Sequence, residues 1–170
     1  MDPRAYWVGF NRVKGIGAVR FQALLDFFGS AELAWQAPAE AYLEAGLSAK
    51  VVESLLNTRQ ALDLPVYWEK IQAAGIAVLT WEDAEYPRRL REVDQSPPVL
   101  YRRGELTLAD EWAVAIGGTR GVSAYGRQAA QDLAACLAQN GITVVSGLAR
   151  GVDGEAHHAA LEAGGRTLAA

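Results

Sequence analysis

The sequence holds few residues that could build a disulfide framework or a metal centre. Cys136 is the single cysteine among 170 residues, and the two histidines, His157 and His158, are adjacent in the chain. One cysteine excludes an intrachain disulfide, and two neighbouring imidazoles cannot alone supply the ligands of a zinc site. We therefore expect neither a metal site nor a cofactor.

An excess of positive charge and a long apolar run are missing as well. The chain has 16 Lys+Arg against 20 Asp+Glu, a formal net charge of −4, which excludes a histone-like nucleic-acid binder. A polyanionic partner would have to be held by a local cluster of cations. The longest uncharged run, residues 133–149, contains Gln139, Asn140 and Ser146 and is too polar to span a membrane. Because the first residues also lack the order of a secretory leader, we expect a cytoplasmic protein with no membrane partner.

Apolar residues are abundant, and their spacing predicts a small all-α domain over residues 1–62. They make up 51% of the chain, which excludes a disordered protein. Val19, Ala23 and Phe27 recur at helical spacing, and turn signals such as Gly29-Ser30 separate the helical stretches.

One turn of this helical region is typical of a helix-hairpin-helix. In such a hairpin a glycine turn presents backbone amides to a phosphate of nucleic acid, and nearby basic groups assist. Lys14, Gly15, Gly17 and Arg20 are therefore candidates for a secondary DNA contact. A protein-binding or purely structural module is the alternative.

From residue 63 onwards the pattern is that of an α/β domain over residues 63–170. Strands are expected at 76–79, 99–101, 113–116, 142–145 and 166–170, and helices at 125–139 and 153–163. The order β-α-β-α-β predicts a doubly wound parallel sheet that is cut off early, and hence the N-terminal part of a longer protein. Asp153 is the expected N-cap of the second helix, and Cys136 is expected in the core.

Two glycine-containing turns directly follow two of these strands, at residues 117–120 and 146–151. The carboxyl ends of parallel strands meet at one edge of a sheet, so the turns should line a shared crevice. Glycine amides, hydroxyls and arginines are suited to phosphate groups. The predicted nucleic-acid-binding residues are Gly118, Thr119, Arg120, Ser146, Gly147 and Arg150. The alternative is that the glycines merely turn the chain between strand and helix.

Ser146, Asp153 and His157 also allow a catalytic interpretation. Asp153 and His157 are four residues apart on a predicted helix and could pair, with Ser146 as a nucleophile. We favour structural roles, because Asp153 suits a helix cap and His157 suits packing or hydrogen bonding. No catalytic residue is therefore predicted.

Several stretches resemble the DNA-processing protein A family (DprA, also called Smf). They are Ala115-Ile116-Gly117-Gly118-Thr119-Arg120, Tyr125-Gly126-Arg127, Ser146-Gly147-Leu148-Ala149-Arg150-Gly151-Val152-Asp153 and Pro98-Val99-Leu100-Tyr101. The resemblance implies an extended Rossmann-like domain preceded by a sterile-alpha-motif-like (SAM-like) or helix-hairpin-helix domain. It also implies that Arg120 and Arg150 line a basic pocket for single-stranded DNA. Gly117 departs from the family, whose members usually have a β-branched residue there.

The resemblance further implies a non-enzymatic recombination mediator that protects incoming single-stranded DNA. It implies a homodimer in the full-length protein and loading of the RecA recombinase during natural transformation. One alternative is a nucleotide-binding Rossmann-like enzyme such as a nucleoside-monophosphate phosphoribohydrolase, although its Pro-Gly-Gly-x-Gly-Thr motif is absent from the sequence. Another is that only the helical module binds nucleic acid, with a preference for duplex or branched DNA.

Overall fold

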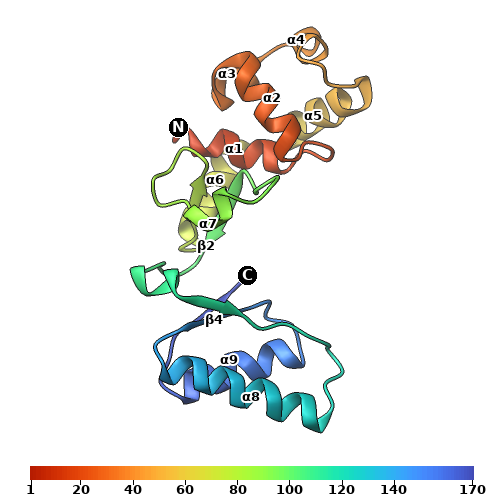
Figure 1. The fold of residues 1–170 in the computed structure, drawn as a ribbon. Coiled ribbons are helices and arrows are strands. Elements are labelled where there is room, and N and C mark those ends of the chain that lie inside the picture. Colours follow the sequence, from red (N-terminus) through yellow and green to blue (C-terminus); the bar gives the residue numbers. More distant parts are fainter. The chain divides into compact units, whose positions relative to one another are not determined.

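Short helices joined by tight turns make up most of the first hundred residues of the computed structural model, which describes residues 1–170 (Figure 1). In chain order they are α1 (Arg4–Asn11), α2 (Ala18–Phe28), α3 (Ala31–Gln36), α4 (Ala39–Glu44), α5 (Ala49–Ala61) and α6 (Leu64–Ala73). Ser30 caps α3 by accepting a hydrogen bond from the N–H of Leu33 at 3.2 Å. Gly29 ends α2 in the left-handed conformation (φ 81°), which glycine adopts without steric cost.

A two-stranded antiparallel sheet follows these helices. It consists of β1 (Ala77–Thr80) and β2 (Val99–Arg102), with the short helix α7 (Arg88–Arg91) between them in sequence. The register pairs Ala77 with Arg102 and Thr80 with Val99. Both strands lie within one residue of the positions predicted from the sequence.

The chain separates into two compact units, Met1–Gly104 and Glu105–Ala170. The first has an aromatic core, in which Trp7 meets Phe21 edge-on with ring centroids 4.9 Å apart. Trp68 of α6 and Val78 of β1 are buried in the same cluster as Trp7, because the connector folds back onto the helices. The first compact unit therefore extends to Gly104. The division into domains 1–62 and 63–170 stays a prediction.

The second unit confirms the predicted order of strands and helices. Its elements are the 3-10 helix η1 (Leu108–Glu111), β3 (Ala113–Ala115), α8 (Ala124–Gln139), β4 (Thr143–Ser146), α9 (Val152–Glu162) and β5 (Thr167–Ala169). The sheet is parallel with the order β3-β4-β5, and the register aligns Ala115, Val145 and Leu168.

Both helices of this unit lie on the same face of the sheet, as Figure 1 shows. One βαβαβ half of a doubly wound sheet has this arrangement, in agreement with the predicted sheet that is cut off early. The physical reason is the strand order. Two successive crossovers of one hand that step in the same direction place both helices on one side.

Alanines form most of the contact between α8 and α9. Ala134 and Ala138 of α8 pack against Ala156 and Ala160 of α9, above Val144 of the central strand. Cys136 is exposed, which corrects the prediction that it lies in the core. The apolar spacing of residues 133–137 does not identify the buried face of α8, because the side chains that face α9 are the alanines.

Asp110 connects η1 to the amino ends of two strands. Its carboxylate accepts hydrogen bonds from Arg166 Nε at 2.6 Å, Arg166 Nη2 at 2.8 Å and Thr143 Oγ1 at 3.1 Å. The Arg166 guanidinium is the main cause that lowers the pKa of Asp110 to about 2 from its usual 3.8. The ionised carboxylate thus fastens the edge of the sheet opposite to the predicted binding turns.

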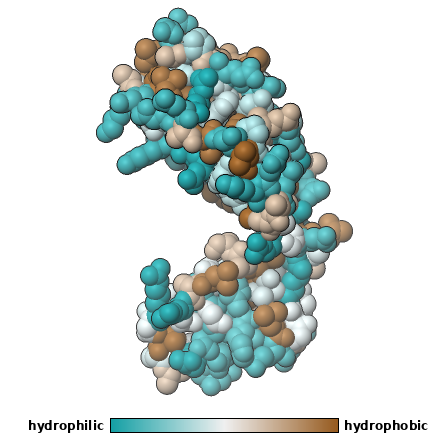
Figure 2. All heavy atoms as spheres, turned by 180° about the vertical axis from the view of Figure 1, so that it is seen from behind, coloured by the Kyte–Doolittle hydropathy of each residue, from teal (hydrophilic) through white to brown (hydrophobic).

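The molecular surface is largely hydrophilic. On the face shown in Figure 2, apolar side chains form separate spots among polar ones. None of the helices combines the length and the apolar character needed to cross a lipid bilayer.

We expect Trp68→Ala to lower the free energy of unfolding of the first unit by about 3–5 kcal/mol, because it leaves a cavity in the shared core. Chemical denaturation followed by far-UV circular dichroism measures the change. Val66→Ala is the matched control, since Val66 lies on the same helix with 43% of its surface exposed and should cost less than about 1 kcal/mol. Equal effects of the two variants would contradict a core that includes residues beyond 62.

We expect Asp110→Asn to destabilise the protein by about 1–2 kcal/mol at pH 7, because the ion pair with Arg166 is lost. A lowered carboxyl pKa contributes stability above the unfolded value of 3.8, and this contribution disappears as the pH falls towards 2. The wild-type protein and the variant should therefore converge in stability between pH 4 and about 2. Denaturation curves at a series of pH values test this, and a constant difference down to pH 2 would contradict it.

Candidate nucleic-acid interface

The structure brings the two predicted glycine turns together at the carboxyl edge of the parallel sheet. A Cβ atom on Gly151 would lie 2.3 Å from the carbonyl oxygen of Thr119 and 2.7 Å from that of Arg120. The N–H of Val152 donates to the Thr119 carbonyl at 3.3 Å. Gly151 has φ 89°, so both its conformation and the available space require glycine. The turn after β3 therefore rests directly on the turn after β4.

Two other glycines allow α9 to approach these turns closely. A Cβ on Gly118 would lie 2.7 Å from Val152 Cγ2, and one on Gly147 would lie 2.9 Å from Asp153 Oδ2. A Cβ on Gly117 would meet no atom within 4 Å, so the small size of this residue serves no packing purpose. The small size of Gly118 and Gly147 thus permits this close packing against α9, whatever else these residues do.

The two hydroxyl groups of the predicted site differ in their surroundings. Ser146 is buried, and its Oγ donates a hydrogen bond to the carbonyl of Ile116 at 2.6 Å. Thr119 is exposed, and its Oγ1 accepts from the N–H of Gly121 at 3.2 Å while keeping its own proton free to donate. Ser146 therefore ties β4 to β3, and Thr119 is the hydroxyl that faces solvent.

Arg120 and Arg150 are both exposed, and neither guanidinium has an ion-pair or hydrogen-bond partner within the chain. The third arginine of this region, Arg127, is paired with Glu155, which also accepts from Gln131 at 2.7 Å. The Glu155 carboxylate is thus already paired with another cation. Two uncompensated positive charges remain on adjoining turns of an acidic chain.

Asp153 is not the N-cap of α9, which corrects the prediction. The chain enters the helix through Gly151, the N-cap, and Asp153 lies inside the first turn. It is buried, and its Oδ2 is 3.4 Å from the N–H of Ala149, its partner in a weak hydrogen bond. A carboxylate in the first turn interacts favourably with the positive end of the helix dipole. Asp153 therefore holds the second turn against the start of the helix.

His157 has the packing and hydrogen-bonding role that was expected. Its Nδ1 is 2.5 Å from Thr167 Oγ1, and that hydroxyl in turn donates to the carbonyl of Val144 at 2.8 Å. The ring thus joins α9 to β5, and the proton on Nδ1 points to Thr167. Neither Ser146 nor Asp153 is hydrogen-bonded to His157, so the three side chains are not assembled as a triad. No group of three or more His, Cys, Asp or Glu residues is arranged to hold a metal ion.

The four residues predicted for a secondary DNA contact in the helical hairpin of the first unit do not all have the same role. Gly15 has φ 96°, and its carbonyl accepts a hydrogen bond from Arg20 Nη1 at 2.6 Å. Arg20 therefore braces the turn, whereas Lys14 is exposed and free of partners. Gly17 is exposed and begins α2 as its N-cap.

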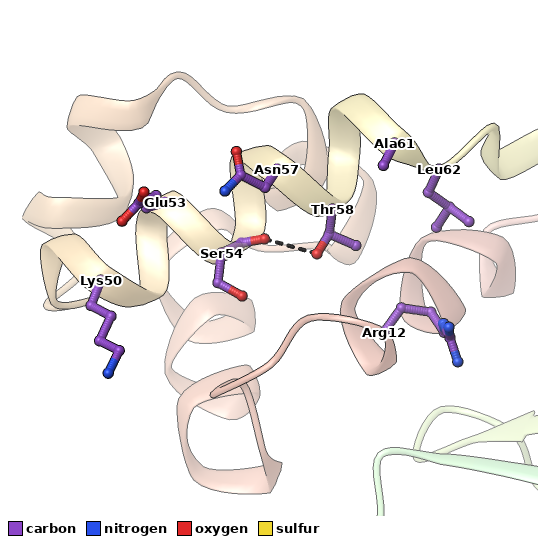
Figure 3. Close-up of a pocket in the computed structure, with 8 residues that line it drawn as sticks. All are labelled: Arg12, Lys50, Glu53, Ser54, Asn57, Thr58, Ala61 and Leu62. Atoms are coloured by element: carbon purple, nitrogen blue, oxygen red, sulfur yellow. Dashed lines mark hydrogen bonds between the residues drawn. The ribbon is translucent and has the colours of Figure 1, made fainter.

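A groove of about 600 Å³ lies along α5 in the same unit and is lined by both polar and apolar side chains (Figure 3). Lys50 and Arg12 stand at its two ends, with the polar side chains of Ser54, Asn57 and Thr58 between them. Lys50 and Arg12 are not among the binding residues predicted from the sequence. The helical spacing of Lys50, Ser54 and Asn57 was the available signal, but nothing in the sequence places Arg12 beside them.

We expect Gly151→Ala to destabilise the second unit by about 3 kcal/mol or more, because its methyl group would overlap two carbonyl oxygens and its φ is positive. Gly117→Ala is the matched control. It meets open space and should change stability by less than about 1 kcal/mol, towards greater stability. Thermal denaturation of both variants measures the difference, and a tolerated alanine at position 151 would contradict the described contact between the turns.

Comparison with known proteins gives a consistent result. A model of the family described as DNA recombination-mediator protein A matches residues 77–170. The protein Smf of Synechocystis is 36% identical over 171 residues, which cover 98% of this chain and 43% of that protein. A putative DNA processing protein DprA of Mycobacterium tuberculosis is 34% identical over 184 residues, with coverage of 99% and 46%. The chain spans less than half the length of these relatives.

A solved structure supports the fold. The X-ray structure of DNA processing protein A from Streptococcus pneumoniae superposes with a TM-score of 0.75, covering 97% of this chain and 56% of that one at 24% identity. The helical first part and the three-stranded parallel sheet thus both have counterparts in a known structure. The chain belongs to the DNA recombination-mediator protein A family, which includes proteins named DprA and Smf.

Proposed function

We propose that the protein binds single-stranded DNA at the carboxyl edge of its parallel sheet. The observation that carries this proposal is the pair of exposed guanidiniums on adjoining turns, Arg120 and Arg150, without carboxylate partners. A guanidinium presents a planar fork of donors that matches the oxygens of a phosphate. The names of the relatives, which refer to DNA processing, point to the same class of ligand.

The binding mechanism is electrostatic. Each phosphate that an arginine neutralises releases condensed counterions, so the logarithm of the affinity should fall with the logarithm of the salt concentration at about −0.7 per contact. The backbone amides of Gly118 and Gly147 and the hydroxyl of Thr119 add donors beside the two charges. Such contacts carry no base information, so this part of the binding is independent of sequence.

We propose that this binding serves recombination, in that the protein protects incoming single-stranded DNA and delivers it to the RecA recombinase in natural transformation. We also propose that the full-length protein acts as a homodimer. Light scattering of the full-length protein tests the dimer. A strand-exchange assay with RecA tests the delivery, with DNA bound by the protein as its substrate.

We propose a binding role for this edge in preference to catalysis. The side chains considered for nucleophilic chemistry are engaged elsewhere, since Ser146 donates to Ile116 and His157 contacts Thr167. Incubation with nucleoside monophosphates, followed by an assay for free base, tests the enzymatic alternative. Release of base at a rate above that of buffer would favour a phosphoribohydrolase.

We expect Arg120→Ala and Arg150→Ala each to weaken binding to an oligo-dT by roughly tenfold, because one charge-assisted phosphate contact is lost. Each should also reduce the salt slope by about 0.7 and affect mixed-sequence oligonucleotides equally. Fluorescence anisotropy at two or more salt concentrations measures both quantities.

Arg89→Ala is the charge-matched control, because Arg89 is exposed on α7 in the other unit. It should change affinity less than about twofold, since only the long-range field of the protein is altered. Unchanged affinity in both variants at the edge would remove the arginines from the site. A stronger affinity for duplex DNA that falls on Lys14→Ala would assign binding to the helical hairpin instead.

A further inference from the structure

Leu148, in the middle of the second turn, has an unusual backbone conformation. Its φ is 50°, in the left-handed region where the Cβ atom of an L-residue crowds its own backbone. Its side chain is 75% exposed. The side chains of Leu108, Trp112 and Tyr125 in the same unit are exposed as well, but of these four it is the one that lies in a glycine turn at the carboxyl edge. Gln95 is the other non-glycine residue with positive φ, and it is polar and belongs to the first unit.

The surrounding contacts impose this conformation on Leu148. On one side, Ser146 is fixed by its hydrogen bond to Ile116, and its carbonyl accepts from the N–H of Ala170 at 2.9 Å. On the other side, the carbonyl of Ala149 accepts from the N–H of Gly154 at 3.2 Å. A strained residue persists where its neighbours determine its geometry in this way, and such residues gather at ligand sites.

Packing of the protein does not explain the exposed side chain. Leu148 is absent from the apolar cluster of the second unit, which is formed by residues such as Ile116, Val144 and Ala156. The same turn therefore holds an apolar side chain in water and carries Arg150 two residues later. Because Gly151 lies against the carbonyl of Arg120, the leucine belongs to a turn that carries Arg150 and contacts the backbone of Arg120.

We propose that Leu148 contacts the face of a nucleobase in the bound single strand. This inference rests on the proposed function of the edge, and it assigns a contact to the bases of the strand in addition to the phosphates. A single strand alternates charged phosphates with flat apolar bases, and sites for such strands combine cations with apolar or aromatic contacts. In duplex DNA the base faces are hidden in the stack. The leucine thus favours single strands, which the arginines alone would not distinguish.

The test compares two ligands of equal charge on the full chain. One is an oligo-dT, and the other is an oligonucleotide of the same length built from abasic residues. Leu148→Ala should weaken binding of oligo-dT roughly fivefold, because apolar contact area is lost, and should leave the abasic strand unaffected. The salt slope should stay unchanged for both ligands, since no phosphate contact is removed.

Two further variants separate the side chain from the shape of the turn. Leu148→Gly removes the side chain and relieves the strain, and it should reproduce the effect of alanine on oligo-dT. Leu148→Met keeps an apolar side chain of similar volume and should bind oligo-dT within about twofold of the wild-type protein. Thermal denaturation confirms that each variant is folded before its affinity is compared.

Two results would overturn the proposal. If Leu148→Ala and Leu148→Gly weaken both ligands equally, the residue acts only through the shape of the turn. If neither ligand is affected, Leu148 does not contact DNA. The arginine variants keep these failures distinct from failure of the proposed function, because Arg120→Ala must weaken the abasic strand as well as oligo-dT.

Discussion

The close approach of Gly151 to the carbonyls of Thr119 and Arg120 is the constraint on which the carboxyl edge depends. It sets the distance between the two turns and the point at which α9 begins. A side chain at this position would separate the turns and move the two arginines apart. The two arginines therefore lie on adjoining turns because residue 151 is a glycine and has no side chain. The hydrogen bond from Ser146 to the carbonyl of Ile116 ties the ends of the two strands together and supports the same arrangement.

The backbone of the two turns at the carboxyl edge is held in place by hydrogen bonds, whereas the side chains of its two free arginines are not. The turns are tied to strands and helix by hydrogen bonds, but the guanidiniums of Arg120 and Arg150 have no partners in the chain. Long free side chains lose rotamer freedom when they bind, which reduces affinity. They can also follow a flexible polyanion whose phosphates are not regularly placed. Such a division suits a ligand that is recognised by charge and not by sequence.

The sequence allowed the strands and turns of the second unit to be predicted because their signals are local. The β-branched run at 142–145 placed β4 within one residue, and the glycine turns followed from their position after strands. The burial of Ser146 and the exposure of Cys136 were not predictable in the same way. Both depend on which face of the strand or helix is covered, and tertiary packing decides that. The proximity of Arg12 to Lys50 and the place of Trp68 in the first core likewise arise only on folding.

The alanine contact between α8 and α9 has a consequence for the second unit as a whole. Alanine side chains bury little apolar area, so a core made largely of them supplies a small part of the free energy that opposes unfolding. A ligand that binds only the folded form adds stability in proportion to the logarithm of its concentration. An oligonucleotide bound at the carboxyl edge, as proposed, would thus raise the free energy of unfolding of this unit by an amount that depends on the DNA concentration.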